Sequence, residues 1–273
     1  MRMLTASFTT LALLVVTVNV ANAAIVDGLT AYWRFNETSG TTADDAVANY
    51  DATLRPNASF VNDAQRGQVM STGAGNSLYD DAGLPFLSTS AGSLLAWVNL
   101  SDTSGTRFMF EEVDYSVGSE PRLYVYSSNG AFKVGIGTTS GYSTSIGSIS
   151  TNAWHQVALT WNENVPGSGS GDVTAFFDGQ AVFGATYSGL TSLGHYLAIG
   201  SSFFPSPGGG VVGNSLGGLM DEAAVWDREL GQQEVLDIFN QGYVLAPVPE
   251  PSSLAILAVG ILVVSAERLR RMV

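Results

Sequence analysis

The chain has 273 residues, of which 31 are glycine, and its 24 acidic and 11 basic side chains give a formal net charge of −13. Binding to a phosphate backbone requires clustered cations, so this acidic composition argues against DNA or RNA as a partner. Cysteine is absent, which excludes disulfides, thiol nucleophiles and thiolate metal sites. Buried sheet surface must therefore supply the stability, with an oxygen-ligated cation as the remaining possible aid.

The N-terminus has the features of a secretion signal. Arg2 precedes an apolar run over residues 11–20, and Ala21-Asn22-Ala23 has the small-x-small pattern of a cleavage site. The apolar run is too short for a comfortable membrane span, which favours removal over anchoring. We therefore predict that residues 1–23 are a signal peptide cleaved after Ala23.

Short apolar, β-branched and aromatic segments follow, divided by turn residues. The predicted strands cover residues 25–36, 52–60, 68–70, 77–79, 93–100, 107–113, 122–127, 131–137, 154–161, 173–177, 181–183 and 196–200. Asn129-Gly130 and Asp178-Gly179 supply the positive φ of hairpin turns. Residues 37–51 are predicted to be a polar loop, and the Pro- and Gly-rich residues 201–217 an excursion from the sheet. Strands of this length and spacing are typical of an all-β sandwich.

The stretch at residues 154–179 is the most informative one. It reads Trp-His-Gln-Val-Ala-Leu-Thr-Trp and, further on, Phe-Phe-Asp-Gly. Together with Tyr-Trp-Arg-Phe near the start and Leu-Met-Asp-Glu-Ala-Ala-Val-Trp near the end, it resembles the laminin-G-like, concanavalin A-like domain. The resemblance implies one two-sheet antiparallel jelly-roll sandwich over residues 24–245, with a closing strand at 218–230 and a short helix at 234–240.

The composition changes in residues 246–273, where three landmarks follow one another. They are Pro249-Glu250-Pro251, the apolar residues 254–266, and the arginines Arg268, Arg270 and Arg271. This order resembles the PEP-CTERM sorting signal of Gram-negative bacteria. The resemblance implies that exosortase, a membrane peptidase, cuts near Pro-Glu-Pro and passes the domain to the cell surface or extracellular matrix. The apolar segment falls short of the roughly 20 residues of a comfortable span, which suits a transient anchor with cytoplasmic arginines; an ordinary tail anchor is the alternative.

One acidic segment contains a candidate pair of catalytic carboxylates. Glu112 and Asp114 are two positions apart and would share one strand face, with Glu111 on the other. A retaining glycosidase on this fold would resemble Glu-x-Asp-x-x-Glu, but Ser116 and Val117 stand where the third carboxylate would be. We therefore predict no catalytic residues and read the segment as a solvated strand edge. The alternative function is a polysaccharide hydrolase or lyase on the same fold.

Other catalytic and metal motifs are weak. His155 and His195 lie 40 residues apart without a second ligand at a suitable spacing, so no zinc site is predicted. His155 belongs to the Trp-His pattern, where a structural role is expected. A Ser-His-Asp triad has no Gly-x-Ser-x-Gly elbow to fix it, and residues 208–210 lack the lysine of a phosphate-binding loop.

Calcium is the one cofactor that the resemblance suggests. Related jelly rolls hold one Ca²⁺ where the closing strand passes the first loop, and Asp221 matches the closing-strand acid. Carboxylate and carbonyl oxygens suit this hard cation, and the loop near Asn36 and the carbonyls of residues 73–76 are candidate partners. The alternative is that Asp221 caps backbone amides of a neighbouring loop.

Carbohydrate binding would need exposed aromatic side chains beside polar groups. The candidates are Tyr115, Tyr124, Tyr126, Tyr142, Tyr187, Phe203 and Phe204, and no spacing selects a set among them. The sequence thus predicts an exported, non-enzymatic surface or matrix protein that binds a glycan or a surface partner through residues it does not identify. A purely structural role in biofilm is a third possibility.

Overall fold

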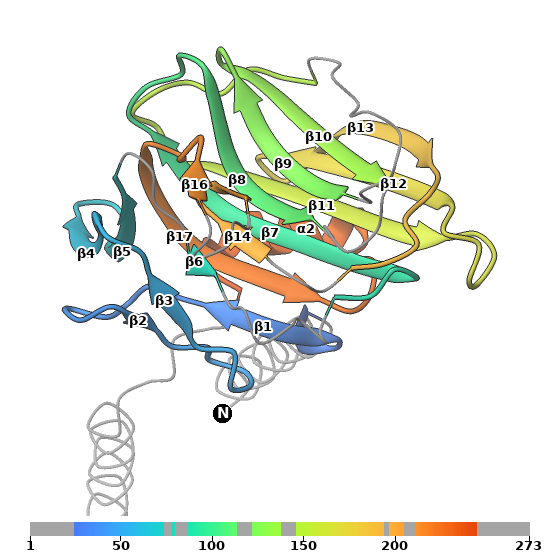
Figure 1. Cartoon of the computed structure of the whole chain (residues 1–273), viewed down its shortest axis with the longest axis horizontal. Helices are drawn as coiled ribbons and strands as arrows, with labels where there is room; N and C mark the ends of the chain where they lie inside the picture. The colour runs from blue at the N-terminus through green and yellow to red at the C-terminus, as the bar shows by residue number, and fades with distance from the viewer. Residues whose placement is uncertain are drawn as a thin grey trace, which may run out of the picture.

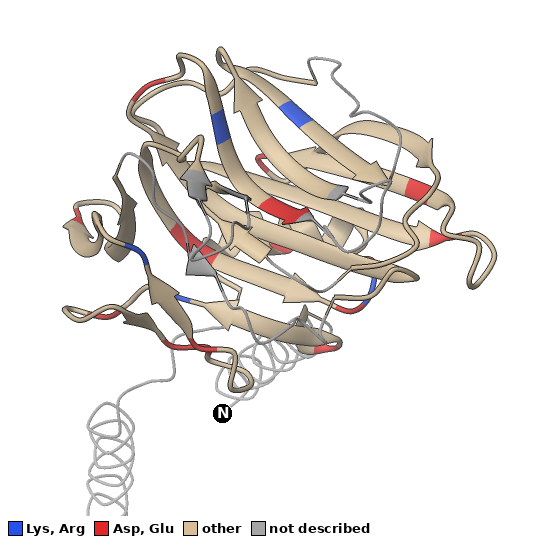
Figure 2. Cartoon of the chain, in the orientation of Figure 1, with Lys and Arg blue, Asp and Glu red and all other residues tan. Residues whose placement is uncertain are grey.

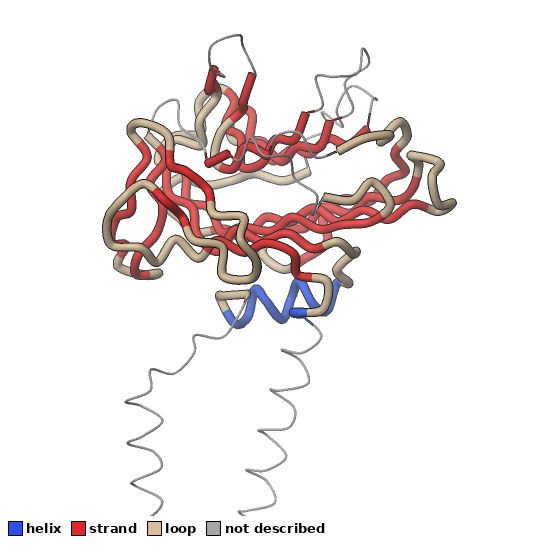
Figure 3. Tube along the Cα trace, turned by 60° about the horizontal axis from the view of Figure 1, so that its bottom comes forward, coloured by secondary structure: helices blue, strands red, loops and turns tan. Residues whose placement is uncertain are grey.

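The computed structural model describes residues 25–73, 78–79, 87–113, 122–137, 146–193, 197–204 and 211–244. These residues form two stacked antiparallel sheets with a short helix on the outer side of one of them (Figures 1 and 3). The predicted signal peptide, Asp114, His195 and the predicted sorting segment lie outside the described residues. No helix within the described ranges is long and apolar enough to cross a membrane.

The larger sheet has eight strands and carries the helix. Its order is β13 (Gln180–Tyr187), β12 (Gly171–Phe177), β11 (His155–Glu163), β7 (Ala91–Leu100), β17 (Gly218–Trp226), β5 (Gly67–Thr72) and β4 (Ala58–Asp63), with β1 (Leu29–Trp33) also paired to β17. The first and closing strands are therefore neighbours, although almost two hundred positions separate Leu29 from its partner Trp226. This pairing closes the sandwich.

The second sheet has seven strands and lies across the core from the first. Its order is β10 (Ala131–Gly137), β9 (Arg122–Ser128), β8 (Thr106–Val113), β14 (Leu197–Ile199), β6 (Leu78–Tyr79), β3 (Ala52–Leu54) and β2 (Thr42–Ala43). A separate hairpin pairs β15 (Ser202–Phe204) with β16 (Val211–Gly213). The sequence predicted an excursion from the sheet at residues 201–217, and this hairpin, which belongs to neither large sheet, adds two short strands that were not predicted.

Two of the predicted strands are wrong in extent. The predicted strand 52–60 is divided between the two sheets, because Asn57 takes φ 75° and the Ala58 N–H donates to the Arg55 carbonyl in a turn. The predicted strand 25–36 shortens to β1 because Gly28 and Phe35 take positive φ at its ends. In both places the backbone conformation of single residues decides the boundary.

The outer face of the larger sheet is covered by helix α2 (Gln232–Gln241). Gly231 precedes the helix, and its N–H donates to Glu234 Oε2 at 2.8 Å, while Gly242 in the left-handed conformation ends it. Val235 and Ile238 lie one turn apart and are fully buried. A second apolar cluster therefore forms on this face, and it includes Tyr32, Leu95, Ala158, Phe176 and Trp226. The polar side chains of Gln156 and Thr160 on β11 are consequently buried as well.

Gly92 on β7 is packed so tightly in the main core that a larger residue at this position should destabilise the fold. A Cβ added at Gly92 would lie 2.2 Å from the ring of Trp161 on the neighbouring strand. Gly92→Ala should lower the free energy of unfolding by about 1–3 kcal/mol, because such overpacking forces the ring to move. Urea denaturation measures this change. The matched control is Gly184→Ala on β13, whose added Cβ meets nothing closer than 4.0 Å and should leave stability nearly unchanged.

Candidate functional site

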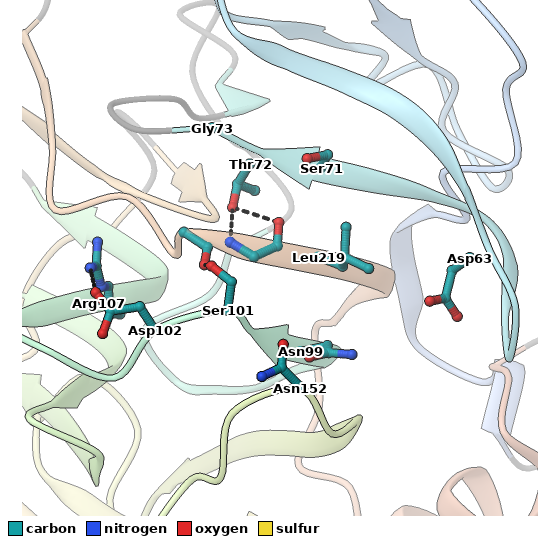
Figure 4. A pocket seen from close by; sticks show the side chains of 12 residues that line it. Asp63, Ser71, Thr72, Gly73, Asn99, Ser101, Asp102, Arg107, Asn152 and Leu219 are labelled. Carbon is teal, nitrogen blue, oxygen red and sulfur yellow. Dashed lines mark hydrogen bonds and ion pairs between the residues drawn. The ribbon is translucent and has the colours of Figure 1, made fainter.

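A polar pocket lies at one end of the larger sheet, where β5, β7 and β17 meet the loops around β8 (Figure 4). Its volume is about 640 Å³. Hydroxyl, amide, carboxylate and guanidinium groups line it together with backbone. The lining residues are Asp63, Ser71, Thr72, Gly73, Asn99, Ser101, Asp102, Arg107, Asn152, Gly217, Gly218 and Leu219. Most of them lie far apart in the sequence.

The register of the sheet explains why these side chains share a face. Leu219 is paired with Asn99 on one side and with Ser71 on the other. Their chain neighbours Val98 and Met220 belong to the core between the sheets, so alternation directs Leu219 and Asn99 to the outer face. The floor of the pocket is therefore a continuous row across three strands, on the same face as the helix.

Backbone packing fixes the inner end of the pocket. Thr72 Oγ1 accepts a hydrogen bond from the Gly218 N–H at 3.2 Å and donates to the Gly218 carbonyl at 3.1 Å, as the dashed lines in Figure 4 show. A Cβ at Gly218 would lie 2.1 Å from the Asn99 carbonyl oxygen, so only glycine allows the strands to approach this closely. These contacts hold the pocket floor rigid.

Arg107 and Asp102 form an ion pair at one side of the pocket. Arg107 Nη2 lies 2.6 Å from Asp102 Oδ2. Hydrogen bonds from the side chain and backbone of Ser104, with a further contribution from Arg107, lower the pKa of Asp102 to about 2. Asp102 is therefore ionised at neutral pH, and the charge of Arg107 is matched within the pocket.

Asp63 and Trp154 form the opposite side. Asp63 Oδ1 accepts hydrogen bonds from the backbone N–H groups of Gln65 and Arg66, both at 2.9 Å, and from the Trp154 indole at 3.1 Å. Partial desolvation raises the pKa of Asp63, but these hydrogen bonds and the charge of Arg66 outweigh it and lower the pKa overall. A carboxylate and a half-buried indole are thus held at the margin of the pocket.

Arg66 joins this margin to Asp221. Its Nε lies 2.6 Å from Asp221 Oδ2, its Nη2 donates to the Gly242 carbonyl at 2.5 Å, and its Cζ lies 4.3 Å from the centroid of the Trp97 ring. Burial raises the pKa of Asp221 to about 7; Arg66 opposes this rise, and the neighbouring Glu222 adds to it. Arg66 therefore ties the β4–β5 turn to the closing strand and to the residue after the helix.

The calcium prediction for Asp221 is not tested by these contacts. Of its candidate partners, residues 74–76 lie outside the described residues, Asn36 lines a separate depression with Arg34, Glu37, Asp44 and Ala46, and the Gly73 carbonyl accepts from Ser215 Oγ at 2.6 Å. Within the described ranges, His, Asp and Glu side chains form no group of three or more suited to a metal ion. The calcium site stays a prediction, and the partner found for Asp221 is a guanidinium.

Because the carboxyl group of Asp221 is buried, we expect the stability of the protein to fall as pH rises. Because its pKa is raised by burial in the folded state, the folded protein binds more protons than the unfolded chain between about pH 4 and pH 7. Stability should therefore fall as pH rises through this range, by an amount on the order of a few kcal/mol. Glu222, whose pKa burial also raises, contributes with the same sign.

Urea midpoints at pH 5 and pH 8 measure this effect. Asp221→Asn should reduce the dependence, whereas Asp172→Asn, which changes an exposed carboxylate on β12, should leave it as it is. A midpoint that rises with pH in the wild-type protein, or a dependence that Asp221→Asn leaves unchanged, would contradict the assignment.

The acidic segment with the candidate catalytic carboxylates continues from β8, which lies inside the seven-stranded sheet. Glu111 and Glu112 on β8 are both buried, and β8 lies between β9 and β14. The interpretation of this segment as a solvated strand edge is therefore wrong. Asp114 lies outside the described residues, so the predicted Glu112–Asp114 pair is not placed.

His155 lies between Ser150 and Asp178. Nothing in the sequence indicated either residue as its partner. Its Nδ1 is 2.9 Å from Asp178 Oδ2, and its Nε2 is 2.7 Å from Ser150 Oγ. The ring stacks on Phe177 at 4.7 Å between centroids. Asp178 Oδ1 also accepts from the Gln156 N–H at 2.9 Å. The group ties the β12–β13 turn to the start of β11.

Asp178→Ala should lower the free energy of unfolding by about 1–2 kcal/mol, because it removes the backbone cap on Gln156 and the partner of His155. The matched control is Asp172→Ala on β12, since Asp172 is exposed, takes no part in that group and should leave stability nearly unchanged. Thermal unfolding followed by circular dichroism compares the two. Equal melting temperatures for wild type and Asp178→Ala would contradict the structural role of this group.

Two stacked antiparallel sheets closed by the pairing of the first and last strands define a β-sandwich of the jelly-roll class. A family model described as the concanavalin A-like lectin/glucanases superfamily matches residues 70–236, and the chain belongs to this family. A second model, the PEP-CTERM protein-sorting motif, matches residues 247–271. Both resemblances predicted from the sequence are confirmed. The sorting motif implies export and sorting to the cell surface by an exosortase in a Gram-negative bacterium.

Solved structures show the same fold at low sequence identity. A sialidase of Trypanosoma rangeli in complex with sialic acid aligns with a TM-score of 0.57 and 16% identity, over 81% of this chain and 34% of that one. The binding domain of botulinum neurotoxin serotype D aligns with a TM-score of 0.54 and 13% identity, over 80% and 53%. The chain thus spans about a third to a half of these structures. No curated protein matches it.

Proposed function

We propose that this protein is an exported, non-enzymatic surface protein that binds a glycan in the pocket between Asp63 and Arg107. The observation that carries the proposal is the pocket itself, in which hydroxyls, amides and two carboxylates converge around the half-buried sheet row of Leu219. Such groups form the hydrogen bonds that sugar hydroxyls require, and Leu219 adds an apolar surface beside them.

The comparisons support glycan binding in general terms. The sialidase was solved with sialic acid, and the ligand-binding domain of the neurotoxin was solved with N-acetylneuraminic acid, at a TM-score of 0.54 and 11% identity over 81% of this chain and 52% of that one. One neighbour is an enzyme and the other a binding domain, so the fold alone supports either function. The absence of a third carboxylate after Glu112 in the sequence favours the non-enzymatic alternative.

The processing steps at the two ends of the chain belong to the same proposal. Residues 1–23 would be removed on export, and the apolar residues 254–266 would hold the precursor in the membrane until exosortase cuts near Pro249-Glu250-Pro251. Val244, the last described residue, is fixed by its N–H donating to Glu222 Oε2 at 2.8 Å. The sorting segment would therefore extend from a fixed point on the folded domain.

A structural calcium ion at Asp221 is a further part of the proposal.

A glycan array and a panel of soluble polysaccharides test the function. The full chain would be purified in a detergent without a sugar headgroup and assayed with millimolar calcium and again with EDTA, with reducing-sugar release measured in the same samples. We expect retention on a glycan without release of reducing ends. Release would support the hydrolase alternative, and loss of retention in EDTA would support the calcium site. No retention on any glycan would contradict the proposed function.

A further inference from the structure

The charges of the pocket are arranged to disfavour anionic sugars. The described lining contains one guanidinium, Arg107, and two carboxylates, Asp63 and Asp102. Arg107 Nη2 is engaged by Asp102 at 2.6 Å, and Arg107 Nη1 lies 3.5 Å from the Ser215 carbonyl oxygen. A sugar carboxylate binds most strongly to a cation that is not already paired, because such charge-assisted hydrogen bonds are the strong ones. With Asp63 also ionised, the lining has an excess negative charge at neutral pH.

The cation beside Asp63, Arg66, is likewise engaged, because its Nε lies 2.6 Å from Asp221 Oδ2. The chain has a net charge of −13, and Figure 2 shows its basic residues as isolated positions among more numerous acidic ones. Like charges brought together at a binding surface reduce both affinity and association rate. An anionic glycan is therefore disfavoured at the pocket and on approach to it.

The polar groups that remain fit hydroxyls. Asn99 from β7 and Asn152 from the loop before β11 line one side of the pocket and Asp63 another, and Leu219 is the partner of Asn99 on the neighbouring strand (Figure 4). An amide both donates and accepts, as a sugar hydroxyl does, and a carboxylate accepts from a pair of adjacent hydroxyls. Leu219 offers an apolar surface to the carbon-bound hydrogens of a ring. All these partners suit an uncharged sugar.

We propose that the pocket selects neutral, hydroxyl-rich glycans over glycans that carry carboxylates, with Asn99, Asn152 and Asp63 as the hydrogen-bonding residues. This inference rests on the proposed function, since it names the ligand class of the same pocket. It separates this chain from its structural neighbours solved with sialic acid, which is an acidic sugar.

Matched hexasaccharides that differ only in a hydroxymethyl or a carboxylate group at C6 test the selection. The full chain in a detergent without a sugar headgroup would be titrated with glucose- and glucuronate-based, galactose- and galacturonate-based, and mannose- and mannuronate-based pairs. We expect the neutral member of the best pair to bind at least about tenfold more tightly than its acidic counterpart at low salt. Higher salt should narrow this difference through screening.

Three variants make the test specific to the pocket. The double variant Asn99→Ala with Asn152→Gly should weaken neutral binding by about tenfold or more, because it removes two hydrogen-bonding amides while glycine keeps the positive φ of position 152. Asp102→Asn should release Arg107 and raise affinity for the acidic member. The matched control is Asp172→Asn, an exposed carboxylate on β12 that is absent from the pocket lining and should change neither affinity.

The binding results distinguish a failure of the selection for neutral glycans from a failure of glycan binding itself. Equal or tighter binding of the acidic member overturns the selection while leaving glycan binding intact. Neutral binding that the Asn99–Asn152 double variant leaves unchanged, in a protein with an unaltered melting temperature, also overturns the inference because the site lies elsewhere. Failure of every member to bind contradicts the proposed function, and the inference falls with it.

Discussion

Trp161→Ala is expected to lower the free energy of unfolding by about 3–5 kcal/mol, one of the two largest effects predicted for a single substitution in this protein. Trp161 is fully buried on β11, where it packs against Gly92 of β7, and its indole N–H donates to the Ser88 carbonyl at 2.9 Å. The substitution removes the apolar burial and leaves a cavity in the core between the sheets. It also leaves the Ser88 carbonyl without this donor.

Urea denaturation of the two proteins measures this loss. The control is Val165→Ala just after β11, because the side chain of Val165 is 63% exposed and should contribute less than about 0.5 kcal/mol. A loss below about 1 kcal/mol for Trp161→Ala would mean that this part of the core is looser than the contacts indicate.

Arg66→Ala is expected to cost about 3–5 kcal/mol at pH 8, because it leaves the buried carboxylate of Asp221 without its partner. The side chains of Arg66 and Asp221 are only 12% and 5% exposed. The substitution also removes the stacking on Trp97 and the hydrogen bond to the Gly242 carbonyl. The β4–β5 turn and Gly242 would lose the link that Arg66 makes between them and Asp221 of the closing strand.

The pH dependence of the stability lost in Arg66→Ala distinguishes the loss of the ion pair with Asp221 from the loss of packing on Trp97. At pH 5 Asp221 is protonated in the fold, so the cost of Arg66→Ala should be smaller than at pH 8. In the Asp221→Asn background the same substitution should show little dependence on pH. An equal cost at both pH values would assign the effect to packing on Trp97 instead. Arg107→Ala, which breaks a more exposed ion pair, is the control and should cost about 1 kcal/mol or less.

The local features of the fold could be predicted from the sequence. The alternating residues of 154–161 form β11, and the Asn129-Gly130 turn joins β9 to β10 with positive φ at both positions. Such signals are local, because side-chain periodicity and turn chemistry depend on neighbouring residues. The family resemblance then supplied the two-sheet architecture and the closing strand, whereas the pairing of the first and closing strands is seen only in the structure.

The pocket could not be predicted, because its residues become neighbours only through the strand order. Ser71, Asn99 and Leu219 come from three strands that are adjacent only in the folded sheet. The indole of Trp154 was read as part of a strand pattern, and nothing in the sequence connects it to Asp63. Arg66 likewise gave no signal as the partner of Asp221, for which a calcium ion was predicted. Long-range side-chain pairs of this kind need the three-dimensional structure.

Hydrogen–deuterium exchange with and without the best-retained neutral glycan tests the central claim most directly, since it locates the bound ligand on the full chain. The account predicts slower exchange at residues 63–73, 99–107, 152–154 and 217–219, which surround the pocket. Protection confined to β9 and β10 on the other sheet, with the pocket segments unchanged, would contradict it.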